Sequence, residues 1–141
     1  MSVSILRSIG AVIAGLVVAM ILIIAVEGIS AVFHPFPPGV DPQDFEACKA
    51  HVAKYPTWVL AVAALGWGAT VFLSSWLATR FGTGRHPAHG IVVGSLLYLA
   101  AASNILMLPY AMWFEVGCLV LLPLCAFAGA WLGKGPPIKA S

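Results

Sequence analysis

Four long apolar stretches, nearly free of charge, are the feature that most constrains what this chain can fold into. They cover residues 9–33, 58–81, 91–108 and 113–132. About 20 apolar residues in a helix cross the ~30 Å hydrocarbon core of a bilayer. Only 9% of the 141 residues are charged, against about 25% in an ordinary soluble domain. The sequence therefore predicts an all-α protein with a single domain, residues 1–141, folded as an antiparallel, up-down bundle of four membrane-spanning helices.

The connection between the first two stretches, residues 34–56, is the longest polar segment. It begins with a proline-rich run that cannot continue a helix, because proline lacks the backbone N–H group. Asp41 and Pro42 then have the form of a helix start, with Asp41 as the N-cap and Pro42 in the first helical position. We therefore expect a short amphipathic helix over residues 42–54 that lies on the membrane surface.

Basic residues are distributed unevenly between the two sides that this topology creates. Five lie on the side of the chain ends and the middle turn: Arg7, Arg80, Arg85, Lys134 and Lys139. Two lie on the other side: Lys49 and Lys54. Lys and Arg are enriched in cytoplasmic loops. The sequence therefore predicts a multi-pass protein of the cell inner (plasma) membrane with both termini in the cytoplasm.

Several functional classes find no support in the residues. The three cysteines, Cys48, Cys118 and Cys125, lack C-x-x-C spacing, which argues against a thiol–disulfide oxidoreductase and against a zinc site. The net charge of +2 is too small to indicate nucleic-acid binding. We therefore expect no metal, no cofactor, no catalytic residue and no nucleic-acid partner, and we interpret Cys118 and Cys125 as packing residues in a helix.

Small residues recur at helical spacing along the spans, and two glycine pairs have the G-x-x-x-G pattern. The pairs are Gly90/Gly94 and Gly129/Gly133. Small residues let helix backbones approach closely in lipid, where hydrophobic burial does not drive association. The pattern fits both packing within one bundle and dimerisation, and the sequence favours the first.

A group of polar residues lies inside the apolar stretches, toward their outer ends. Glu27 lies roughly 9 Å inside the outer end of the first span, and Ser30 and His34 follow on the same helix face. Asn104 lies at a similar depth in the third span, and Glu115 lies near the start of the fourth. Acids at such depth are costly and often serve function. We predict that these five residues form one binding pocket.

The chemistry of such a pocket has two interpretations. Its two carboxyl groups could bind a cation, or share or relay a proton. Alternatively, Glu27 is hydrogen-bonded to Asn104 or to a hydroxyl group and only fixes how the helices pack. A metal site built from Glu27, His34 and Glu115 is not favoured, because the spacing is unspecific. The remaining histidines are expected on the solvated surface: His51, His86 and His89.

The chain resembles the small multidrug resistance transporters in size, in the number of spans and in the glutamate of its first span. It departs from them because Glu27 lies near the outer end and because residues 34–56 form too long a connection, so their activity is not carried over. It is more similar to a group of small bacterial four-helix membrane proteins with no established activity. The similar parts, about half the chain, are Val26-Glu27-Gly28, His34-Pro35-Phe36-Pro37-Pro38-Gly39, Asp41-Pro42-Gln43-Asp44 and residues 66–80. This resemblance implies the membrane architecture and a bacterial origin.

Two functional hypotheses follow, with a third behind them. The sequence favours a non-enzymatic integral membrane protein, an accessory or structural component that packs in the lipid bilayer as a homo-oligomer or in a larger membrane complex. The alternative is a small ion- or proton-coupled transporter or binding protein that uses the outer acidic pocket with Glu27 and Glu115. The third is a membrane enzyme that acts on lipid. An open cavity around the acids would favour the second and third, and a fully packed bundle would favour the first.

Overall fold

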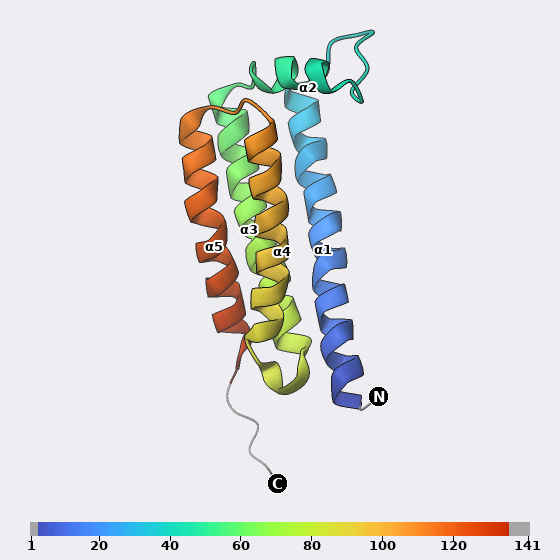
Figure 1. Ribbon diagram of the computed structural model, residues 1–141, viewed down its shortest axis with the longest axis vertical. Helices are drawn as coiled ribbons and strands as arrows, with labels where there is room; N and C mark the ends of the chain where they lie inside the picture. Colours follow the sequence, from blue (N-terminus) through green and yellow to red (C-terminus); the bar gives the residue numbers. More distant parts are fainter. Residues whose placement is uncertain (1–2, 136–141) are drawn as a thin grey trace.

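The computed structural model describes residues 3–135, which form helices joined by short connections (Figure 1). The helices are α1 (Val3–Phe33), α2 (Phe45–Val52), α3 (Thr57–Phe81), the 3-10 helix η1 (Thr83–Arg85), α4 (Ala88–Met107) and α5 (Met112–Gly133). Four of them, α1, α3, α4 and α5, are long and apolar enough to cross a membrane. The prediction of an all-α protein with four candidate membrane-spanning helices is therefore confirmed for the described residues.

Helix α1 begins at Val3, earlier than the boundary predicted at residue 9. The extra turns carry polar side chains that form hydrogen bonds with residues near the end of α3. Arg7 Nε donates a hydrogen bond to the carbonyl of Phe81 at 3.0 Å, and Ser8 Oγ donates to Oγ1 of Thr83 at 3.1 Å. Apolar length alone does not predict these turns, because tertiary contacts help to stabilise them.

Figure 1 shows the four long helices side by side, with α2 lying across one end of the molecule. We call this the α2 end. The start of α1 and the end of α5 lie at the opposite end, which we call the terminal end. Helix α3 packs against all three other long helices, whereas α1 packs mainly on α3 and less on α4. Helix α3 is therefore the central element, and α1 is peripheral.

The main hydrophobic core lies among α3, α4 and α5. Its buried residues are Leu60, Ala63, Val71, Ile105, Phe114, Cys118 and Leu122. Cys118 is fully buried, and Cys125 is half-buried against this core. Helix α1 joins the other helices through small residues: Ala11, Gly15, Ala19 and Ser30. Its large apolar side chains remain exposed, as expected for a helix whose outer face contacts lipid.

Both G-x-x-x-G pairs bring helices of this chain into close contact. A methyl group on Gly90 would collide with the carbonyl oxygen of Ser75 and with Oγ1 of Thr79, both on α3. A methyl group on Gly129 would collide with the carbonyl oxygen of Phe72, also on α3. The glycines therefore let α4 and α5 approach α3, which is the packing within one chain that the sequence favoured.

Helix α2 is shorter than the predicted helix over residues 42–54, and it begins at a different cap. Asp44 is the N-cap, and its Oδ1 accepts a hydrogen bond from the N–H group of Glu46 at 3.0 Å. Asp41 Oδ1 instead accepts from the N–H group of Gln43 at 2.9 Å, in the turn before the helix. The prediction of Asp41 as the cap was wrong. Both aspartates suit a cap, and only the path of the turn between them decides which one is used.

Replacing Asp44 with alanine is expected to destabilise α2 by about 1 kcal/mol, the usual cost of a lost N-cap. Asp41→Ala is the matched control, because it removes the same chemical group from the preceding turn and leaves the cap intact. Amide hydrogen exchange of α2 in detergent-solubilised protein measures the difference. Equal exchange rates in the two variants would show that contacts other than the cap hold this helix.

Candidate functional site

A cavity of about 410 Å³ extends from the middle of the molecule toward the α2 end. This volume lies within the range of ~300–1,000 Å³ that is typical of small-molecule sites. All four long helices contribute to it. Its polar lining consists of Glu27 from α1, Trp67 and Thr70 from α3, and Asn104 from α4. The rest of the lining is apolar: Ile23, Val71, Leu97, Ala100, Ala101 and Leu122.

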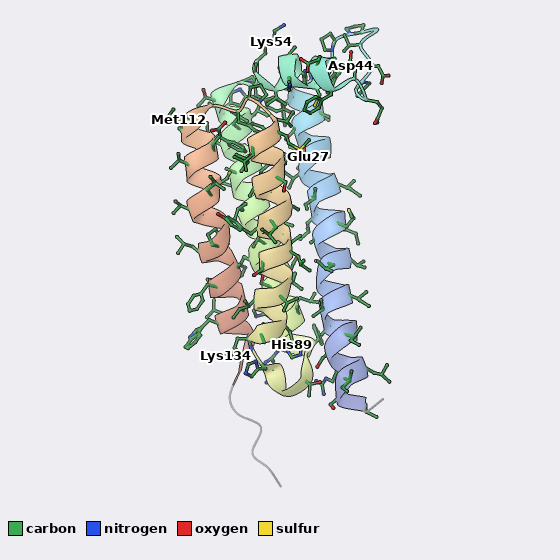
Figure 2. The ribbon with its side chains drawn as sticks, in the orientation of Figure 1. Glu27, Asp44, Lys54, His89, Met112 and Lys134 are labelled. Atoms are coloured by element: carbon green, nitrogen blue, oxygen red, sulfur yellow. The ribbon has the colours of Figure 1, made fainter. Side chains whose placement is uncertain are left out.

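Glu27 is held at this cavity by a hydrogen bond from the neighbouring helix. Trp67 Nε1 donates to Glu27 Oε1 at 3.1 Å, which links α1 to α3. Figure 2 shows Glu27 on α1, close to the α2 end. The helices approach closely here, because a methyl group on Gly66 would lie only 2.7 Å from Cγ2 of Val26. An indole N–H group inside an apolar span needs an acceptor, and the carboxylate supplies it.

Asn104 is positioned by a residue that follows α4. Its Oδ1 accepts a hydrogen bond from the hydroxyl of Tyr110 at 3.1 Å. The Tyr110 ring packs against Phe114 with a centroid distance of 4.8 Å, and against Trp67 with a centroid distance of 6.4 Å. Thr70 Oγ1 donates to a carbonyl of its own helix at 2.8 Å. The asparagine and the tryptophan are therefore both held in place by packing at the α2 end of the cavity.

Glu27 has no basic side chain within ion-pairing distance among residues 3–135. Among residues 3–135, the only ion pair joins Lys49 to Glu46, both on α2, at 3.1 Å. Burial, followed by the charge of Glu27, raises the pKa of Tyr55 and of Tyr110. Both phenols therefore remain neutral at physiological pH. The site thus combines one carboxylate with neutral hydrogen-bonding groups and apolar walls.

Ser30 and His34 do not line this cavity. Ser30 is buried in the last turns of α1, and its carbonyl accepts the N–H group of His34 at 2.8 Å. The His34 ring stacks on His51 of α2 with centroids 4.2 Å apart, and His34 Nε2 lies 3.2 Å from the carbonyl oxygen of His51. Phe36 also stacks on His51, with centroids 3.9 Å apart. These aromatic contacts tie the loop after α1 to α2.

His51 is buried, with only 7% of its surface exposed, so the expectation of a solvated residue was wrong. Burial, followed by the nearby charge of His34, lowers the pKa of His51. The stack that buries His51 forms only when the proline-rich loop folds back over α2, and helical periodicity does not predict that contact. His86 is exposed, as expected, while His89 is half-buried with Nε2 3.0 Å from Ser8 Oγ.

Glu115 does not line the cavity either. It lies half-buried in the first turn of α5, where a carboxylate interacts favourably with the positive end of the helix dipole. Of the five predicted pocket residues, Glu27 and Asn104 thus share one cavity, and the other three lie elsewhere. Within residues 3–135, no three His, Cys, Asp or Glu side chains are grouped so that they could hold a metal ion.

Sequence reasoning missed Trp67 and Tyr110 as members of the site. A usable signal was present for Trp67, because a tryptophan in the middle of an apolar span must place its N–H group against an acceptor. Glu27 is the one acid within the first three predicted spans, so it was the natural partner. Tyr110 gave no such signal, since a tyrosine at the end of a span is also a common interfacial anchor.

Comparisons with protein-family models, with curated proteins and with solved structures find no match for this chain.

The chemistry of the cavity lining limits which molecules the cavity can bind. Its apolar walls suit hydrocarbon groups, and its carboxylate suits a positive charge. The ring of Trp67, next to the carboxylate, is the side chain type that interacts best with organic cations. A small molecule with one cationic group and an apolar body therefore matches this lining.

Proposed function

We propose that this chain is a non-enzymatic membrane protein that binds small amphipathic cations in the cavity beside Glu27. In this proposal it is an antiparallel four-helix bundle of a bacterial inner membrane, with the terminal end in the cytoplasm. The observation that carries the function is the carboxylate of Glu27, which has no cationic partner among residues 3–135 and borders an apolar cavity. A cationic ligand would supply a charge of opposite sign to this carboxylate.

The packing of the helices supports entry of the ligand from the bilayer. Glu27 and Asn104 are exposed although they line the cavity, and α1 packs less closely on α4 than on α3. The side of the cavity between α1 and α4 is therefore the accessible one. In a membrane, lipid surrounds the protein at this depth, and amphipathic cations partition into lipid. This route would give the ligand access without an aqueous channel.

Binding of benzyltrimethylammonium to the purified protein in mild detergent tests the proposal. This cation has a fixed charge and an apolar ring, and it is small enough for the cavity. Its uncharged analogue neopentylbenzene has the same shape, with carbon in place of nitrogen. The cation is expected to bind more tightly than the analogue in calorimetric titrations. Equal affinity of the two molecules, or no binding of either, would contradict the proposal.

The accessory role predicted from the sequence is the second candidate, and one observation favours it. The hydrogen bond between Trp67 and Glu27 joins α1 to α3, so Glu27 also has a purely structural use. In that case the protein would pack as a homo-oligomer or within a larger membrane complex, and the cavity would be filled by lipid or by a partner helix. Variants of Glu27 distinguish the two candidates.

The proposed orientation leads to a prediction for the cysteines. Cys48 lies on α2, whereas Cys118 and Cys125 lie within α5. An impermeant maleimide, applied to intact cells whose outer membrane is permeabilised, is expected to label the protein through Cys48 alone. Cys48→Ser should abolish the labelling, and Cys118→Ser should leave it unchanged. Labelling that persists in Cys48→Ser would contradict the placement of α5 in the bilayer, and labelling of wild type only after cell lysis would reverse the orientation.

A further inference from the structure

Two arginine side chains converge at the terminal end of the molecule, far from the cavity. A Cβ atom placed on Gly135 would lie 2.7 Å from one terminal nitrogen of Arg85 and 2.9 Å from one terminal nitrogen of Arg80. Both arginine side chains are half-buried. Two guanidinium groups repel each other, and an anion that contacts both removes this repulsion. The arrangement therefore suits an anionic ligand.

No acidic side chain of the protein is available to these arginines. The chain has five acidic residues: Glu27, Asp41, Asp44, Glu46 and Glu115. They lie on α2, on the loop before it, and on the parts of α1 and α5 nearest the α2 end. Figure 2 labels two of them, Glu27 and Asp44, near that end. The arginines belong to the opposite end, where α3 and η1 meet. A ligand that neutralises them must therefore bring its own negative charge.

The backbone holds Arg85 in an uncommon conformation. Its φ angle is +50°, and it follows Gly84 with a φ angle of +63°. Residues other than glycine rarely adopt positive φ angles, and they do so mainly where surrounding contacts determine the conformation. Here Thr83 Oγ1 donates to the carbonyl of Ser4 at 2.7 Å, which anchors the turn to α1. The turn is thus fixed so that Arg85 is directed toward Arg80.

We propose that Arg80 and Arg85 bind the phosphate group of an anionic phospholipid. Arg80 lies in the last turn of α3, a candidate membrane-spanning helix, and therefore at the level of the lipid headgroups. Planar guanidinium groups form paired hydrogen bonds with phosphate oxygens. Large apolar side chains are exposed at the same end of the protein and can contact the acyl chains: Phe81, Trp131 and Leu132. These contacts favour a lipid over a free phosphate ion.

Native mass spectrometry of the purified protein in a neutral detergent tests this site with phosphatidylglycerol and with phosphatidylcholine. The wild type is expected to bind phosphatidylglycerol in preference to the zwitterionic lipid. R80Q/R85Q is expected to weaken phosphatidylglycerol binding by about 30-fold, the effect of losing two basic residues near an anionic lipid. K49Q/K54Q removes the same charge from the α2 end, and it is expected to leave the binding unchanged.

Three results would overturn the proposal. The first is equal binding of the two lipids by the wild type, and the second is an equal loss of binding in R80Q/R85Q and K49Q/K54Q. The third is displacement of phosphatidylglycerol by an equal concentration of inorganic phosphate, which would indicate a site for a free anion. Circular dichroism checks the folding of R80Q/R85Q. If it does not fold, the single variant R85Q replaces it with an expected loss of about fivefold, and unchanged binding in R85Q then overturns the proposal.

Discussion

Glu27→Gln is expected to weaken the binding of benzyltrimethylammonium by about fivefold. Glutamine keeps an oxygen that can accept the hydrogen bond from Trp67 Nε1, so the variant removes the negative charge and little else. Glu27 is exposed on the surface of the protein, and an exposed charge pair contributes up to about 1 kcal/mol, which corresponds to about fivefold in Kd. Calorimetric titration of the purified protein in detergent measures this change.

Two controls separate an effect of charge at the cavity from a general effect on the protein. Glu115→Gln makes the same chemical change at a half-buried acid that does not line the cavity, and it is expected to leave the affinity unchanged. Neopentylbenzene is expected to bind wild type and Glu27→Gln alike, because it has no charge. If Glu115→Gln weakens cation binding as much as Glu27→Gln does, the site assignment is wrong.

Glu27→Leu distinguishes ligand binding from the accessory role. Leucine removes both the charge and the acceptor, which leaves the indole N–H group of Trp67 without a partner in an apolar environment. Such a loss costs about 1–3 kcal/mol. If Glu27 is only structural, Glu27→Gln should be nearly silent and Glu27→Leu should disturb folding or assembly. If the cavity binds cations, both variants should bind the cation more weakly, although Glu27→Gln remains as stable as the wild type.

Gly129→Ala is expected to destabilise the protein by about 1–3 kcal/mol, the usual cost of an extra methyl group in a closely packed interface. The added Cβ would collide with the carbonyl oxygen of Phe72 and would lie 3.1 Å from the backbone nitrogen of Trp76. Both are backbone atoms of α3, so no side chain can rotate away to relieve the contact. Unfolding in mixed micelles with increasing sodium dodecyl sulfate measures the free energy.

Gly117→Ala is the matched control, because it makes the same substitution in the same helix. A Cβ atom on Gly117 would have no atom of a neighbouring helix within 4 Å, and alanine stabilises helices by about 1 kcal/mol relative to glycine. Gly117→Ala is therefore expected to be neutral or slightly stabilising. Equal stability of the two variants would mean that α5 does not depend on close contact with α3. Dissociation of an oligomer without a change in monomer stability would instead assign Gly129 to dimerisation.

The candidate site could be predicted only in part from the sequence. Glu27 could be recognised because placing an acidic side chain within an apolar span costs free energy whichever way the side chain points. Asn104 was included because it lies at a similar depth. Depth does not show which way a side chain faces, however. Ser30 and His34 were grouped with Glu27 by helical spacing, yet His34 lies at the end of α1 and stacks on His51 instead. Glu115 was included because it lies near the start of the fourth span. In the structure it lies in the first turn of α5, where it interacts with the positive end of the helix dipole.

The sequence by itself determined the number of candidate membrane-spanning helices and most of their boundaries, because spanning length and proline breaks are local properties. It also showed that Glu27 is exceptional. Only the tertiary structure decided that Trp67 donates to Glu27, that Asp44 caps α2, and that His51 is buried. The physical reason is that α1 is apolar on nearly all sides, so no amphipathic face sets its rotation. Contacts such as the one between Gly66 and Val26 set that rotation instead, and they arise only when the helices pack.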